Sequence, residues 1–136
     1  MLPFEFVVDG PPVSHQATDR DRLARWRERV REAAAAAWPP ADMPETDQLE
    51  IAVTYYHEGE TVNLDNDNMI KPIQDALAGL VYINDRQITD TRVRKTSLDG
   101  AFRIRGTSVV LALAFVRSVE FIHVALRKKP DHTEFI

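Results

Sequence analysis

The stretch from Asn63 to Thr91 constrains the fold of this chain more than any other part. Its apolar residues recur at helical spacing and its polar residues fall on the opposite side, which predicts an amphipathic helix. The apolar positions are Met69, Ile70, Ile73, Ala76, Leu77 and Leu80. Because proline is costly inside a helix but harmless at the first position, the regular helix is expected to begin near Pro72, after an entry turn from Asp67 to Lys71. Gly79 would end it.

Three carboxylates surround this helix. Asp65 and Asp67 precede it, and Asp85 follows the short apolar run that comes after it. In extended backbone, side chains at positions i and i+2 point the same way, so Asp65 and Asp67 should face one direction. Carboxylate oxygens suit Mg²⁺, which keeps several waters or substrate oxygens around it. Since the chain has no cysteine, an oxygen-bound metal is the candidate.

The same residues also have a purely structural interpretation. Asp and Asn before a helix are common N-cap and turn residues, and Asn84-Asp85 could form only a turn. Lys71 and Asp75 lie one helical turn apart and could form a solvated pair worth roughly 0.2–0.5 kcal/mol. Each residue taken alone favours this interpretation, so the decision depends on their combination.

The combination resembles the signature of the RusA family of Holliday junction resolvases. The family pattern runs D-x-D-N-x-x-K-P-x-x-D-A-L, then Gly, then a D/N-D pair, then Q-[IV]-x-D. The residues that match are Asp65, Asp67, Asn68, Lys71, Pro72, Asp75, Ala76, Leu77, Gly79, Asn84, Asp85, Gln87, Ile88 and Asp90. So many ordered matches in a short segment are far more specific than a single short motif.

The resemblance implies a Mg²⁺-dependent endodeoxyribonuclease, with Mn²⁺ as a substitute, that cuts four-way DNA junctions by paired nicks. It also implies a homodimer, whose two-fold symmetry suits such a substrate. The residues to which it assigns metal binding and catalysis are Asp65, Asp67 and Asp85. Lys71 would act in the active site, and Asn68 and Asp75 would support the ligands indirectly. Gln87 and Asp90 follow the pattern without an assigned role.

The sequence departs from this family in its charge. Asn84 takes the first position of the paired acids, and the segment from His57 to Asn63 carries Glu58 and Glu60 but no lysine or arginine. The formal net charge is −4, whereas strong DNA binders usually present a basic surface. Two alternatives therefore stay open: a module that binds branched nucleic acid without cutting it, and a nuclease that acts on flaps, forks or RNA.

The length of 136 residues predicts one domain spanning 1–136, and the resemblance implies an α+β fold with a small mixed β-sheet packed with helices. Strands are expected at Phe4–Val8, Gln48–Tyr56, Ile88–Leu98 and Glu120–Arg127, and helices at Asp19–Trp38 and Ser108–Val116. Residues 101–105 would return as a hairpin, and residues 128–136 would form a flexible polar tail. The second of these two helices is almost wholly apolar, so we expect it in the core or at an interface.

Neither a signal peptide nor a membrane span is evident, so a cytoplasmic location without a membrane partner is expected. Two basic clusters could contact DNA. Six arginines between positions 20 and 31 are interleaved with acids, which favours a solvated face, although one edge could follow a phosphate backbone.

The second basic cluster comprises Arg92, Arg94, Lys95, Arg103 and Arg105. It is the better candidate for DNA contact because it follows Asp85 closely, with an exposed charged sheet face as the equal alternative. Alternation along the strand puts Arg92 and Arg94 on one face and Lys95 on the other. In the loop after the first strand, His15 and Gln16 are candidates for a substrate contact, with a plain surface loop favoured.

Overall fold

Four strands form one mixed sheet in the spatial order β1-β4-β2-β3. The computed structural model of the chain describes residues 1–60, 62–99, 106–117 and 119–133. In chain order, the elements are β1 (Phe4–Asp9), α1 (Arg20–Ala37), β2 (Leu49–His57), α2 (Asn66–Leu77), the 3-10 helix η1 (Asp85–Gln87), β3 (Ile88–Ser97), α3 (Val109–Arg117) and β4 (Phe121–Lys128). The predicted α+β class is confirmed, and the strand boundaries lie within one or two residues of those expected.

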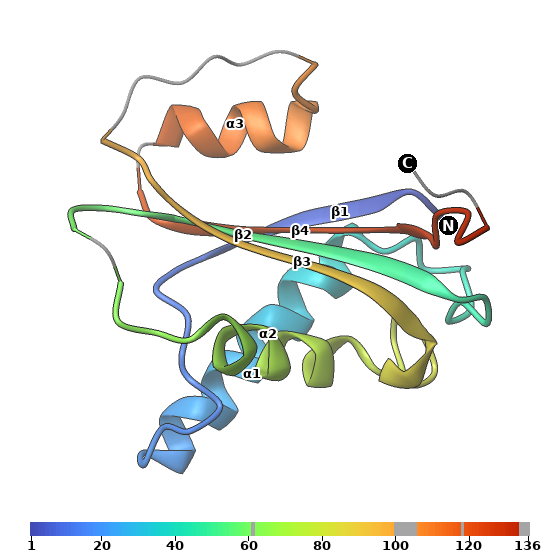
Figure 1. Cartoon of the computed structure of the whole chain (residues 1–136), viewed down its shortest axis with the longest axis horizontal. Helices are drawn as coiled ribbons and strands as arrows, with labels where there is room; N and C mark the ends of the chain where they lie inside the picture. The colour runs from blue at the N-terminus through green and yellow to red at the C-terminus, as the bar shows by residue number, and fades with distance from the viewer. Residues whose placement is uncertain (61, 100–105, 118, 134–136) are drawn as a thin grey trace.

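The sheet is mixed because β4 pairs antiparallel with both β1 and β2, whereas β2 pairs parallel with β3. Parallel neighbours need a crossover connection, and here α2 provides it. The two ends of α2 therefore adjoin two different connections: one arrives from the end of β2, and the other leads through η1 into β3 (Figure 1). This topology brings the predicted site residues toward one helix.

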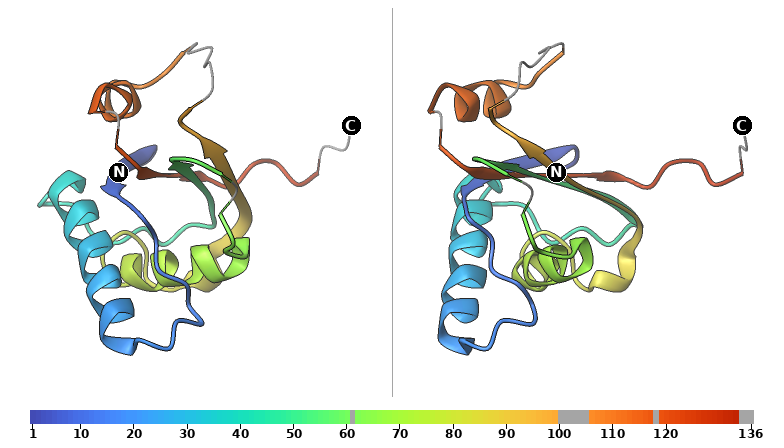
Figure 2. Two further views of the ribbon diagram at one scale, coloured as in Figure 1. Left: turned by 90° about the vertical axis from the view of Figure 1, so that its left-hand side faces the viewer. Right: turned by 60° about the vertical axis from the view of Figure 1, so that its left-hand side comes forward.

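The core lies between the sheet and the pair α1 and α2, which cover one face, here called the α1–α2 face (Figure 2). Alternate residues of β2 point into this core: Leu49, Ile51, Val53 and Tyr55 are buried. From α1, the buried residues are Leu23, Trp26, Val30 and Ala34. Asp19 caps α1, since its side chain accepts a hydrogen bond from the Arg22 amide at 3.0 Å.

The start predicted for α2 is wrong. The helix begins at Asn66 and continues through Pro72, instead of starting near that proline after a separate turn. Because Pro72 has no N–H, it cannot donate to the carbonyl of Asn68, four residues earlier. The backbone N–H of His15 donates to that oxygen instead, at 2.9 Å. The helix ends at Leu77, and Gly79 follows with a φ of 84°.

Helix α3 lies on the opposite face of the sheet, here called the α3 face (Figures 1 and 2). Ser108 caps it, because its hydroxyl accepts a hydrogen bond from the Leu111 amide at 3.2 Å. Burial in the core of the chain was the wrong expectation: of its described residues only Ala114 is buried, while Val109, Leu113 and Val116 are 74%, 62% and 79% exposed. The other expectation, an interface, stays a prediction.

The end of the chain makes contacts that a polar tail need not make. Strand β4 includes Lys128, the Lys129 amide donates to the carbonyl of Gln48 at 3.1 Å, and Nε2 of His132 lies 2.7 Å from Oδ1 of Asp90. The hairpin expected at residues 101–105, with Arg103 and Arg105, lies outside the described residues. Among the helices that the structure describes, none is both long enough and apolar enough to cross a bilayer.

Candidate functional site

Two carboxylates stand at the first turn of α2 with no side-chain partner in the described parts of the chain. Asp65 is the N-cap residue, but its side chain makes no capping hydrogen bond. Asp67 lies in the first helical turn, where the helix dipole favours a negative charge. Because α2 starts at Asn66, the expectation that both acids sit in extended backbone is wrong. Both are exposed, so their oxygens are accessible to a ligand.

The third carboxylate, Asp85, is the first residue of η1 and is held by its neighbours. The side chain of Asn84 accepts a hydrogen bond from the Arg86 amide, and the side chain of Gln87 accepts one from the Asn84 amide, both at 2.9 Å. This reciprocal arrangement is a capping box. Nε2 of Gln87 also donates to the carbonyls of Glu45 and Asp47. Asn84, the residue at which the sequence departs from the family's pair of acids, thus caps η1 and fixes Asp85.

Lys71 links the helix to this turn. Its Nζ lies 2.9 Å from Asp75 and 3.0 Å from Asp85. The hydrogen bond to Asp75, followed by the one to Asp85, raises the pKa of Lys71, so the ammonium stays charged. The predicted pairing of Lys71 with Asp75 is confirmed. Since these side chains are about a third or more exposed, the pairs contribute little stability and mainly fix positions.

Tyr82 supports the same region from the core. Its role was not predicted from the sequence. It is fully buried, and its hydroxyl donates to the carbonyl of Gln74 on α2 at 2.7 Å. Burial raises the pKa of Tyr82, and the nearby charges of Asp85 and Asp75 raise it further. The hydroxyl therefore remains a donor and ties the segment before η1 to α2.

Lys95 holds the segment that leads into Asp65 at the start of α2. In the β2–β3 register it stands opposite Tyr55, which points into the core, so Lys95 lies on the α1–α2 face. Its Nζ donates to the carbonyl of Leu64 at 2.5 Å, directly before Asp65. The sequence predicted Lys95 as a DNA-contacting residue, whereas in the structure it is hydrogen-bonded to the backbone directly before the candidate metal ligand Asp65.

The three candidate carboxylates have oxygen donors of the kind that suits a metal ion, but their side chains are not gathered around one point. Asp65 and Asp67 offer the hard oxygen donors that Mg²⁺ prefers, and no other group of the described chain competes for them. Asp85 is engaged by Lys71. Within the described ranges, no three Asp, Glu, His or Cys side chains lie close enough together to hold an ion. The described part of the chain therefore does not gather the three carboxylates into one ion-binding cluster.

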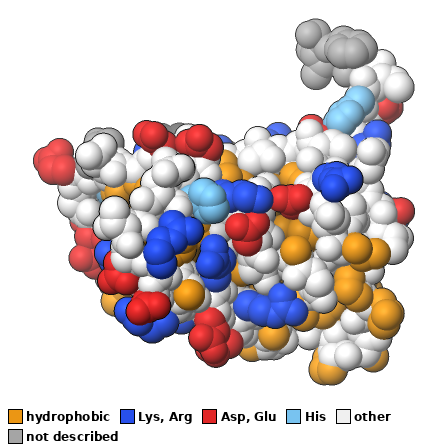
Figure 3. Space-filling model, turned by 90° about the horizontal axis from the view of Figure 1, so that it is seen from below, with side chains coloured by type: hydrophobic (Ala, Val, Ile, Leu, Met, Phe, Trp, Pro, Cys, Tyr) orange, Lys and Arg blue, Asp and Glu red, His pale blue; other side chains and the backbone are white. Residues whose placement is uncertain are grey.

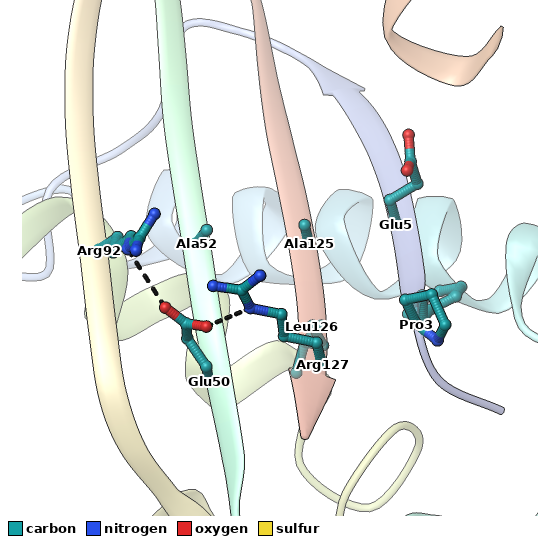
Figure 4. Close-up of a pocket in the computed structure, with 9 residues that line it drawn as sticks. Pro3, Glu5, Glu50, Ala52, Arg92, Ala125, Leu126 and Arg127 are labelled. Carbon is teal, nitrogen blue, oxygen red and sulfur yellow. Dashed lines mark hydrogen bonds and ion pairs between the residues drawn. The ribbon is translucent and has the colours of Figure 1, made fainter. Parts of the chain in front are cut away.

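The predicted strand cluster is divided between the two faces of the sheet, as its alternation indicated. Arg92 points to the α3 face, where its Nε lies 3.2 Å from Oε1 of Glu50, and Arg127 binds the other oxygen of the same carboxylate (Figure 4). Glu50 is only 4% exposed because the two arginines cover it. Beside them is a hollow of about 220 Å³, with Ala52 and Ala125 among its lining residues.

The arginines of α1 have mixed roles. Arg31 donates to the carbonyls of Ala76 and Ala78 at 3.1 and 3.0 Å, which fastens α1 to α2. Arg22 and Arg25 line a separate hollow of about 310 Å³ together with Arg29. Figure 3 shows the α1–α2 face with basic side chains gathered near its centre and carboxylates interspersed among them. This mixture agrees with the solvated interpretation for part of the set.

A family model described as endodeoxyribonuclease RusA matches residues 11–105 of the chain. The match begins in the loop that contains His15 and spans α1, β2, α2, η1 and β3. No curated protein matches the chain by sequence.

Proposed function

The chain belongs to the endodeoxyribonuclease RusA family, and on that premise we propose that it cuts four-way DNA junctions in a reaction that requires a divalent metal. The observation that carries this proposal is the first turn of α2. Asp65 and Asp67 stand there exposed and without side-chain partners in the described chain, while Lys71 joins the same helix to Asp85. Carboxylates can hold a divalent metal that activates a water, and an ammonium on the same helix can neutralise charge that develops on a phosphate.

Asp65 and Asp67 would bind Mg²⁺ or Mn²⁺, and Asp85 would join them when Lys71 releases it. When bound, the metal would polarise the scissile phosphate and favour deprotonation of a water. Lys71 would neutralise charge that develops on the phosphate oxygens. Lys71 is a charged ammonium at neutral pH, and its raised pKa extends this charge to more alkaline conditions. Asp75 would keep the ammonium in place after Asp85 has moved away.

We also propose that the protein acts as a homodimer. The exposed residues Val109, Leu113 and Val116 recur on one side of α3, and monomeric proteins rarely leave such a stripe uncovered. A second copy is the occupant that fits the substrate, since two symmetric sites can nick two strands of a symmetric junction. The aromatic contact between Phe115 and Tyr56 fixes α3 on the sheet, so its outer surface is preformed.

DNA contacts would come from exposed arginines. Arg22 and Arg25 belong to α1, which covers the same face of the sheet as α2 (Figure 2). Arg92 and Arg94 remain proposed phosphate contacts, but they would serve DNA that passes the α3 face near the edge strand β3. Because the chain carries a net charge of −4, we expect modest affinity with a marked dependence on salt.

The rival function is a module that binds branched DNA without cutting it. Calorimetric titration with Mg²⁺ separates the two, because a nuclease of this kind binds the ion with its carboxylates. We expect heat of binding at millimolar Mg²⁺ that is lost in the Asp65→Asn variant. Junction binding without measurable metal binding would support the module instead.

A further inference from the structure

Pro72 interrupts the hydrogen-bond ladder of α2 without ending the helix. In a regular helix the amide of residue 72 would donate to the carbonyl of Asn68, but proline has no N–H to donate. The amide of His15 takes this place, with its nitrogen 2.9 Å from the Asn68 oxygen. The loop between β1 and α1 is therefore attached to α2 at a carbonyl that a proline leaves open.

This loop is built as a rigid turn. The amide of Ala17 donates to the carbonyl of Ser14 at 3.0 Å, and the amide of Gln16 donates to the Ser14 hydroxyl at 3.0 Å. Nη1 of Arg20 donates to the carbonyls of both His15 and Ala17. Because these backbone groups are hydrogen-bonded, the loop can hold one conformation while the side chain of Gln16 remains exposed.

The attachment point lies inside the candidate site. Asn68 directly follows Asp67, so the loop meets α2 at the turn that carries the unpaired carboxylates. Figure 1 shows the loop passing beside the first turn of α2. Nδ1 of His15 is buried and has no hydrogen-bond partner in the described part of the chain. Nδ1 of the His15 ring is thus enclosed by neighbouring atoms, and within the described residues it makes no hydrogen bond that would stabilise the turn.

Stability alone does not account for the proline. Proline is the least favourable residue in a helix interior, and a single backbone hydrogen bond from a loop offsets only part of its cost. An alanine at position 72 would complete the ladder of α2 and give a better helix. The feature that only proline provides is the open carbonyl of Asn68, and the structure uses it to hold the loop.

We propose that Pro72 is a positioning residue. By leaving the Asn68 carbonyl free for the His15 amide, it locks the loop of residues 14–17 against the turn of α2 that carries Asp65 and Asp67. The loop and this turn together form one wall of the nuclease site. This inference rests on the proposed function for its second part. The lock itself is a property of the fold. The DNA strand that approaches Asp67 would pass along this wall and meet Ser14 and Gln16.

The lock is tested with Pro72→Ala, which restores an amide that competes for the Asn68 oxygen. We expect the His15 amide to lose at least tenfold of its protection from hydrogen exchange, while the melting temperature stays equal or rises. Pro40→Ala, a loop variant, should leave His15 protection unchanged. Protection of His15 retained in Pro72→Ala would overturn the lock.

A second variant removes the donor and leaves α2 intact. Because proline has no amide of its own, release is measured in these variants at the Gln16 and Ala17 amides, which bond to Ser14. Both amides should lose protection from hydrogen exchange in His15→Pro, whereas His15→Ala keeps the backbone donor and should retain their protection. This pair keeps the test decisive if Pro72→Ala folds poorly. Release in His15→Ala but not in His15→Pro would show that the side chain holds the loop and would contradict the proposal.

The positioning role is tested by kinetics on a synthetic four-way junction with Mg²⁺. Pro72→Ala and His15→Pro should raise KM at least fivefold with a smaller change in kcat, and Pro40→Ala should match the wild type. A released loop with unchanged KM and kcat would overturn the positioning role. If the wild type cuts no branched DNA, the proposed function fails, and hydrogen exchange still decides on the lock.

Discussion

Lys71 on α2 and Asp85 on η1 meet at 3.0 Å between Nζ and Oδ2. This contact joins α2, the crossover helix between β2 and β3, to η1, which leads into β3, and it places a protonated amine beside the candidate metal ligand Asp85. Asp75 binds the same amine at 2.9 Å, so the ammonium is held from two sides. The site therefore has a fixed positive charge before any metal or substrate arrives.

Replacing Lys71 by Gln should reduce cleavage strongly and leave the fold intact. Loss of one charge-stabilising donor typically lowers kcat by roughly 10²–10³-fold. The ion pairs are partly exposed, so the free energy of unfolding should change by less than about 1 kcal/mol. Lys128→Gln is the matched control, because Lys128 faces Asp47 at 3.8 Å in a surface pair far along the chain from the site. Equal kcat values in the two variants would contradict the role of Lys71.

Replacing Lys95 by Met should weaken metal binding, because the carbonyl of Leu64 would lose its anchor directly before Asp65. Loss of an outer contact of this kind typically lowers metal affinity by about 10–100-fold. Arg94→Met is the control on the same strand, since Arg94 points to the α3 face. Calorimetric titration with Mg²⁺ checks both, and the account is wrong if Arg94→Met loses as much affinity as Lys95→Met.

Alkaline pH should destabilise the fold through Tyr55. Burial and then its hydrogen bond to Glu120 raise the pKa of Tyr55 above its ordinary value. A group with a raised pKa stabilises the folded state fully below its unfolded pKa of about 10, and this contribution is lost as the pH rises through the folded value. The free energy of unfolding should therefore fall between about pH 10 and pH 12.

Tyr55→Phe should lose about 1 kcal/mol of stability at neutral pH through the missing hydrogen bond, and its stability should then depend less on alkaline pH. Urea denaturation at pH 8, 10 and 11 measures both effects. A slope as steep as that of the wild type would show that other groups cause the alkaline loss.

A charge on the outer side of α3 should dissociate the proposed dimer. Leu113→Glu puts a carboxylate in the middle of the exposed apolar stripe, where desolvation on association would oppose dimer formation. Light scattering after size exclusion should give a dimer for the wild type and a folded monomer for the variant. Met43→Glu, at another exposed apolar position, is the control and should stay dimeric. A monomeric wild type would contradict the proposed homodimer.

The strand pattern and the capped helix α1 could be predicted from local sequence, because alternation and an N-cap Asp act over a few residues. The course of α2 could not, since the donor to the Asn68 carbonyl that Pro72 leaves open is His15, more than fifty positions earlier. Periodicity likewise showed that α3 is apolar but not that most of its surface points away from the sheet.

The sequence could predict which residues belong to the candidate site, but it could predict few of the contacts among them. Asp65, Asp67, Lys71 and Asp85 stood out through their combination, and the structure brings Lys71 to Asp85. Alternation placed Lys95 on the opposite side of β3 from Arg92, but it could not show which side faces α2. That depends on the crossover, which is a property of the whole sheet.

Metal-dependent cleavage is tested by incubating a synthetic four-way DNA junction with the wild type and with Asp67→Asn, in Mg²⁺ and in EDTA. We expect paired symmetric nicks by the wild type in Mg²⁺ only, and none by a folded Asp67→Asn protein that still binds the junction. Asp131→Asn, an exposed acid after β4, should cut like the wild type. Wild-type protein that binds the junction but leaves both strands intact in Mg²⁺ and Mn²⁺ would show that the chain does not cut junctions.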